Sequence, residues 1–115
     1  MDYSNFLPDI DVEDGKKRIM ENMSLYARLL GRFECAKMTD NIIAAIDAND
    51  EKALLQAAHA LKGTAANLSF PTVFNVVSEI DSLCKDGSDC SHLKQGLLDA
   101  TASLDAAIKR FLATL

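Results

Sequence analysis

Three residue types that suit phosphate chemistry stand close together in the stretch AHALKGTAANLSF, residues 58–70. The imidazole of His59 can act as a nucleophile near neutral pH. Lys62 places a positive charge three residues further on, and Gly63 removes a side chain four residues further on. Residues at these spacings share one face of a helix. The pattern indicates a histidine that accepts a phosphoryl group, with room beside it for the protein that delivers the group.

A helical wheel for residues 51–68 separates His59 from the expected core face. The apolar residues of that face are Leu54, Ala57, Ala58, Leu61, Ala65 and Leu68. His59 lies well away from them, so we expect its ring to be accessible to solvent. This argues against a buried structural histidine, although an ordinary surface histidine stays open. The alternatives for the other two residues are a glycine that packs against a neighbouring helix, for Gly63, and an ordinary surface lysine, for Lys62.

No other catalytic or metal-binding pattern is found in the chain. His92 has no lysine or glycine companion, and we assign it no role. A di-metal site in a helical bundle needs repeated Glu-x-x-His pairs, whereas this chain offers Asp89-x-x-His92 alone. No phosphate-binding loop and no nucleophile–base pair of a hydrolase is present. We therefore predict no metal and no cofactor of its own.

Length and composition fit one globular domain. The chain has 115 residues, and its 12 basic and 17 acidic side chains give a net charge of −5. This balance argues against a nucleic-acid partner. No long apolar run or signal-peptide pattern occurs, so we expect a cytoplasmic protein without a membrane partner. The odd cysteine count, with no CxxC pair, predicts reduced thiols.

The spacing of apolar residues predicts helices nearly throughout. Residues 1–10 are expected to form a flexible N-terminal arm, and residues 11–115 a single helical domain. A short helix over 11–20 precedes one long or kinked helix over 24–48, followed by a helix over 51–68. After a junction at 69–71, where Ser69 can cap the next helix, two more helices follow. We predict an all-α fold: an antiparallel up-down four-helix bundle with a short extra helix at its N-terminus.

The motif AHALKGTAANL resembles the phosphorylation motif of histidine-containing phosphotransfer (HPt) domains, the carriers of two-component phosphorelays. The upstream stretch DIDVEDGKKRIMENMSLYARLLGRF resembles the usual lead-in of such domains, so the resemblance covers most of the chain. It implies that His59 is the phosphoacceptor, Lys62 the cation beside the phosphoryl group and Gly63 the position of clearance. Ser69 departs from the family pattern, which often has a glycine there.

The resemblance also implies roles for two residues of the following helix. Family members place a polar residue 22 positions after the histidine, where it hydrogen-bonds the ring, and here that residue is Asp81. Its carboxylate would accept a hydrogen bond from the Nδ1–H group and so leave Nε2 free to react. Lys85, four residues later, would be a second cation. Alternatively, Asp81 is a solvated helix residue and Lys85 a cation at a helix end.

As an HPt domain, the protein would take a phosphoryl group from a receiver-domain aspartate or a histidine kinase and pass it to a response regulator. It would be a carrier, not a turnover catalyst, and would act as a monomer. Mg²⁺ would sit on the partner receiver domain of the hybrid sensor kinase or response regulator. Docking would use Leu55, Gln56, Gly63 and Ala66. The alternative is a helical module that binds such partners without being phosphorylated. The Met1 start weakly favours a free-standing protein.

Overall fold

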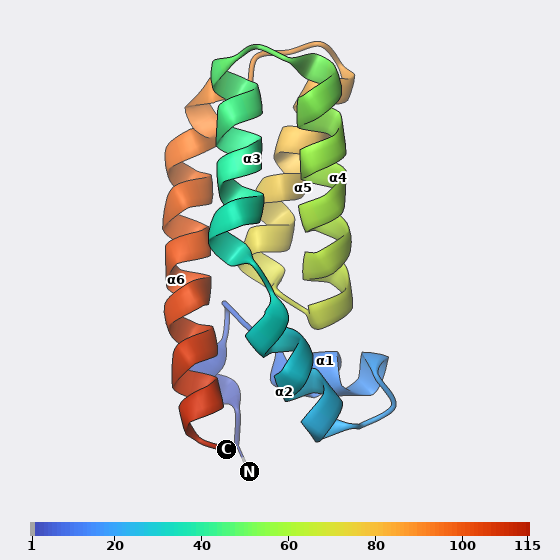
Figure 1. Ribbon diagram of the computed structural model, residues 1–115, viewed down its shortest axis with the longest axis vertical. Helices are drawn as coiled ribbons and strands as arrows, with labels where there is room; N and C mark the ends of the chain where they lie inside the picture. Colours follow the sequence, from blue (N-terminus) through green and yellow to red (C-terminus); the bar gives the residue numbers. More distant parts are fainter. Residues whose placement is uncertain (1) are drawn as a thin grey trace.

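The computed structural model describes residues 2–115, which form α-helices and two short 3-10 helices with no strand. Figure 1 shows their arrangement. The six α-helices are α1 (Val12–Arg18), α2 (Met23–Arg32), α3 (Cys35–Asp47), α4 (Glu51–Leu68), α5 (Pro71–Lys85) and α6 (Lys94–Ala113). The 3-10 helices are η1 (Ser4–Phe6) and η2 (Ser91–Leu93). The expected all-helical class is confirmed.

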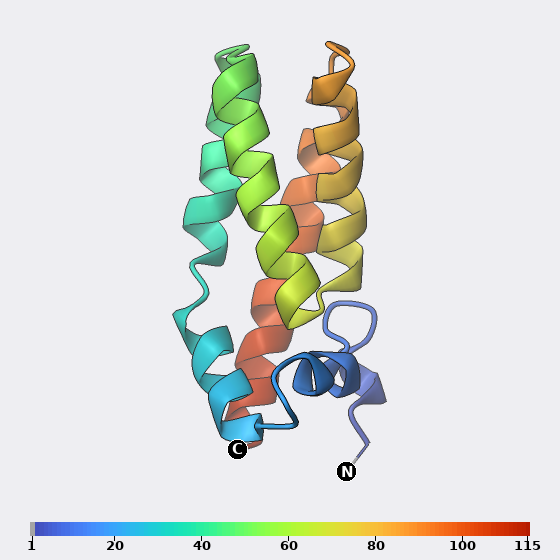
Figure 2. The same cartoon turned by 90° about the vertical axis from the view of Figure 1, so that its right-hand side faces the viewer.

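Helices α3, α4, α5 and α6 lie side by side along the long axis of the molecule, and each runs opposite to the next (Figures 1 and 2). The shorter helices α1 and α2 lie together at one end of this group. The inward faces of the four long helices bury apolar side chains, which is the packing that amphipathic helices require. No helix within residues 2–115 combines the length and apolar character that a bilayer crossing needs.

The helix count differs from the prediction because the long or kinked helix expected over residues 24–48 is two separate helices, α2 and α3. Phe33 is extended (φ −66°, ψ 119°), and α3 begins only at Cys35. The ring of Phe33 packs against that of Phe70 at a centroid distance of 5.2 Å. The apolar spacing continues through the break, so periodicity alone did not reveal it. A contact between residues distant in sequence accompanies the change of direction.

Residues 2–10 are packed against the domain, which corrects the expectation of a flexible arm over residues 1–10. Phe6 and Ile10 are buried, and the Phe6 ring meets Phe111 of α6 edge to face. Thr72 donates a hydrogen bond to the carbonyl of Pro8, so the segment is also tied to α5. These contacts reach across the whole sequence, which local pattern reading does not capture. Met1 lies outside the described residues.

Ser69 was expected to cap the start of α5. Within residues 2–115, however, α5 has no side-chain cap, and Ser69 instead forms the C-terminal end of α4. Its backbone is left-handed (φ 62°), a conformation that glycine adopts with least strain. Its hydroxyl donates to Asp14 Oδ2 at 2.8 Å, and its carbonyl accepts from the Asp11 amide at 2.9 Å. These bonds give the serine a role that glycine would fill only in part. They tie the turn between α4 and α5 to α1.

Replacing Gly15 with alanine is expected to lower the free energy of unfolding by about 2 kcal/mol, the usual cost of overpacking. An added Cβ would lie 2.5 Å from Cζ and Oη of Tyr26. Tyr26 is fully buried and its hydroxyl donates to the Leu68 carbonyl at 2.6 Å, so the ring has little freedom to move. Urea unfolding measures the change.

Gly31→Ala is the matched control, because an added Cβ there meets nothing within 4 Å. In that helix, alanine should raise the free energy of unfolding by up to about 1 kcal/mol. Equal effects of the two substitutions would contradict the packing of Gly15 against Tyr26.

Candidate functional site

His59 lies on the outer face of α4. This helix begins where expected, because the Asp50 side chain accepts a hydrogen bond from the Ala53 amide at 3.1 Å and caps it. The residues buried on its inner face are Leu54, Ala58, Leu61, Ala65 and Leu68. His59 itself is exposed, as the wheel predicted, so a partner molecule can reach its ring.

Gly63 stands one helical turn after His59 and is exposed. A Cβ added to this glycine would meet nothing within 4 Å. No neighbouring helix therefore approaches closely at this point, and the alternative of a packing glycine is wrong. The missing side chain leaves open space on the same face as the imidazole, where a second protein could approach it.

A cluster of three charged residues, which we call the Asp81 cluster, joins α4 to α5. Asp81 Oδ2 lies 3.5 Å from Lys62 Nζ and 2.9 Å from Lys85 Nζ. The Asp81 side chain is only 4% exposed, whereas those of Lys62 and Lys85 are 35% and 62% exposed. Lys62 follows His59 by three residues on α4, so the cluster adjoins the histidine.

The partners of Asp81 differ from the expected one. The resemblance implied a hydrogen bond from the His59 ring, but within residues 2–115 the carboxylate is hydrogen-bonded to Lys62 and ion-paired with both lysines. A buried carboxylate is stable as an anion only when cations or donors compensate for its lost hydration. The hydrogen bond from Lys85 is the main cause that lowers the pKa of Asp81, and the charge of Lys62 contributes. Asp81 is thus not the solvated residue of the alternative interpretation.

The lowered pKa predicts how the contribution of Asp81 to stability depends on pH. In the folded protein the pKa lies below its usual 3.8, so the stabilisation is present above about pH 4. It is lost as the pH falls through the folded-state pKa. Asp81→Asn should therefore destabilise the protein at pH 7 and less at pH 3, as measured by urea unfolding. An unchanged difference at the two pH values would contradict this assignment.

The expected docking residues surround His59 but are not all equally open. Gln56 is exposed, whereas Leu55 and Ala66 are half-buried. Beside Ala66 the structure has a shallow hollow that sequence reasoning missed, bordered by Arg18 and by Phe74 and Asn75 of α5. These residues come from helices far apart in sequence, so no sequence signal could have brought them together. They extend the accessible surface along α4.

The remaining reactive side chains lie apart from this face or are buried. His92 is exposed on η2, in the connection between α5 and α6. Cys35, Cys84 and Cys90 are buried free thiols, and burial raises the pKa of each. Within residues 2–115 no group of three or more histidine, cysteine or acidic side chains is arranged to hold a metal ion.

Comparison with known protein families decides the class of the domain. The model of the Hpt domain family matches residues 32–114, which is most of the chain. The chain belongs to the HPt domain family. HPt domains are phosphocarrier modules of two-component phosphorelays and interact with receiver domains. No curated protein sequence matches the chain.

The fold of this HPt domain is similar to a solved relative. This relative is the HPT domain from the Hpt sensor hybrid histidine kinase of Shewanella, whose crystal structure extends to 1.80 Å. The two share 22% sequence identity and superimpose with a TM-score of 0.83. The match covers 92% of this chain and 95% of the relative, so it extends over nearly the whole of both.

Proposed function

We propose that His59 is the phosphoacceptor of this HPt domain. The observation that carries the proposal is the exposed imidazole on α4, with a lysine and an open glycine within one turn of it. An exposed neutral imidazole has a free nitrogen lone pair, and Gly63 leaves space for the group that must reach it. The chain's other histidine, His92, has no such surroundings.

The reaction is a transfer between an aspartyl phosphate and an imidazole. The lone pair of His59 Nε2 forms a bond to phosphorus while the bond from phosphorus to the receiver's aspartate oxygen breaks. The receiver regains its carboxylate, and Nδ1 of His59 keeps its proton. Onward transfer to a response regulator reverses these steps. The protein is then a carrier, and Mg²⁺ is held by the receiver, where it offsets the charge of the phosphoryl oxygens.

Lys62 stabilises the phosphorylated state by its charge. A phosphoryl group at pH 7 carries close to two negative charges, and an ammonium group nearby forms charge-assisted hydrogen bonds with it. The docking surface for the receiver domain consists of Leu55, Gln56, Gly63 and Ala66. The shallow hollow beside Ala66, bordered by Arg18 and Phe74, extends this surface. We infer that the domain docks as a monomer, because the four docking residues follow one another along a single helix, α4, and need no second copy to complete the surface.

The experiment that tests the proposal is phosphoryl transfer from a radiolabelled, phosphorylated receiver domain with Mg²⁺. The protein should take up label that is lost in acid and kept in alkali, as expected of a phosphoramidate. Label that survives acid would place the phosphoryl group on another residue type. No label from any of several receivers, in a protein that is folded and helical, would favour a binding module that is not phosphorylated.

A further inference from the structure

Asp81 is a buried carboxylate with one more cation than it needs. Its Oδ2 atom meets the ammonium groups of both Lys62 and Lys85, which come from different helices. A carboxylate that is 4% exposed and loses its only cation pays a large desolvation cost. With two cations present, either one can leave while the other keeps the carboxylate paired.

The two lysines are not equivalent in this arrangement. Lys85 lies four residues after Asp81 on the same helix and makes the shorter contact, 2.9 Å. Lys62 crosses from α4, makes the longer contact of 3.5 Å, and stands three residues from His59. Lys62 is therefore both the more weakly held cation and the one on the helix of the phosphoacceptor.

We propose that Asp81 and Lys85 are positioning residues: Lys85 keeps the buried carboxylate paired so that Lys62 can turn from Asp81 to the phosphoryl group on His59. The inference rests on the proposed function of His59 and adds a regulation of the same site. Before phosphorylation, Asp81 holds Lys62 beside the imidazole. After phosphorylation, the more negative phosphoryl group attracts Lys62, and Lys85 alone neutralises Asp81.

This arrangement makes a prediction that direct contact of Lys85 with phosphate does not make. Without Lys85, Lys62 is the only partner of Asp81, and its move to the phosphoryl group would leave a buried charge unpaired. The phosphorylated state should then be less populated. Without the charge of Asp81, Lys62 can move to the phosphoryl group whether or not Lys85 is present. The loss of Lys85 should then leave the population of the phosphorylated state nearly unchanged.

The test is a double-mutant cycle with wild type, Lys85→Met, Asp81→Asn and the double variant. Each is equilibrated with a phosphorylated receiver domain and Mg²⁺, and the ratio of phosphorylated carrier to phosphorylated receiver is measured. Lys85→Met should lower this ratio about tenfold in the wild-type background, which corresponds to about 1.4 kcal/mol. In the Asp81→Asn background the same change should alter it less than about twofold.

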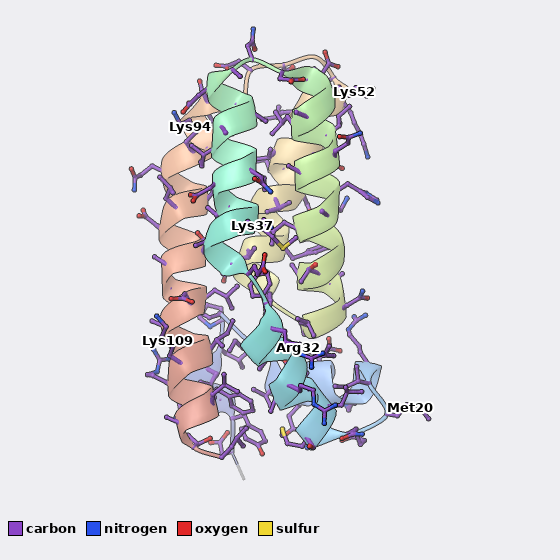
Figure 3. The ribbon with its side chains drawn as sticks, viewed as in Figure 1. Met20, Arg32, Lys37, Lys52, Lys94 and Lys109 are labelled. Atoms are coloured by element: carbon purple, nitrogen blue, oxygen red, sulfur yellow. The ribbon has the colours of Figure 1, made fainter. Side chains whose placement is uncertain are left out.

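Two controls separate positioning from folding and from general charge effects. Lys85→Arg keeps the cation and should restore the wild-type ratio. Lys109→Met removes a lysine from a similar pair, 2.9 Å from Asp105 at the same i,i+4 spacing, but both members are exposed on α6 (Figure 3). It should leave the ratio unchanged. Thermal unfolding followed by circular dichroism checks that every variant is folded.

The outcomes distinguish this inference from the proposed function. An equal loss from Lys85→Met in both backgrounds would show that Lys85 acts on the phosphoryl group directly, and would overturn the inference alone. So would the absence of any effect of Lys85→Met. If the wild-type protein takes no label, the proposed function fails, and the inference fails with it.

Discussion

Replacing His59 with glutamine is expected to abolish phosphoryl uptake and to leave the fold intact. The amide nitrogen of glutamine has no available lone pair, so it cannot form the bond to phosphorus that an imidazole nitrogen forms. The side chain at this position is exposed, and such substitutions usually change stability by less than about 0.5 kcal/mol. Label transfer and urea unfolding should be measured on the same preparation.

The natural control for this substitution is the second histidine of the chain. His92→Gln changes the same residue type at another exposed site and should leave uptake at the wild-type level. If uptake survived in His59→Gln and was lost in His92→Gln, the phosphoacceptor would be His92, and the proposed role of His59 would be wrong. Binding of His59→Gln to the receiver should persist, because the docking surface is unchanged.

Replacing Gly63 with glutamine is expected to slow phosphoryl transfer at least about tenfold while it stabilises the protein. Small displacements of reacting groups cost about this much or more in rate. The new side chain would stand on the face of α4 that carries His59, in space that is now open, and would hinder the approach of the receiver. Because glutamine is the better helix former, the free energy of unfolding should rise by about 0.5–1 kcal/mol.

Gly96→Gln is the matched control for this change. Gly96 is an exposed helical glycine of α6, and an added Cβ there also meets nothing within 4 Å. It should give a similar gain in stability with no change in the transfer rate. If Gly63→Gln transferred phosphoryl groups as fast as Gly96→Gln, the clearance assigned to Gly63 would be wrong.

Features set by local interactions could be predicted from the sequence. Helix α4 spans the expected residues because an aspartate caps its first turn and apolar side chains recur along one face. The exposure of His59 follows from the same wheel. Asp11 likewise caps α1 by accepting a hydrogen bond from the Asp14 amide, although α1 ends at Arg18 and does not extend to Met20. Met20 projects from the connection that follows (Figure 3).

Features set by contacts between distant segments could not be predicted. Only the family resemblance indicated that Asp81 lies beside the helix that carries His59. Its ion pairs with Lys62 and Lys85 depend on how α4 packs against α5, which the sequence pattern does not specify. The packing of Phe6 against Phe111 joins the two ends of the sequence, which gives a local pattern no means of detecting it. The break after α2 is of the same kind, since helical spacing continues across it.

The measurement that tests the central claim most directly is nuclear magnetic resonance of the phosphorylated protein, with its histidines labelled with nitrogen-15. Coupling between phosphorus and a ring nitrogen identifies the modified atom without any substitution. We predict a single phosphoryl group on Nε2 of His59, with the His92 ring unchanged. Coupling to His92, or a phosphoryl group bonded to no histidine nitrogen, would contradict it.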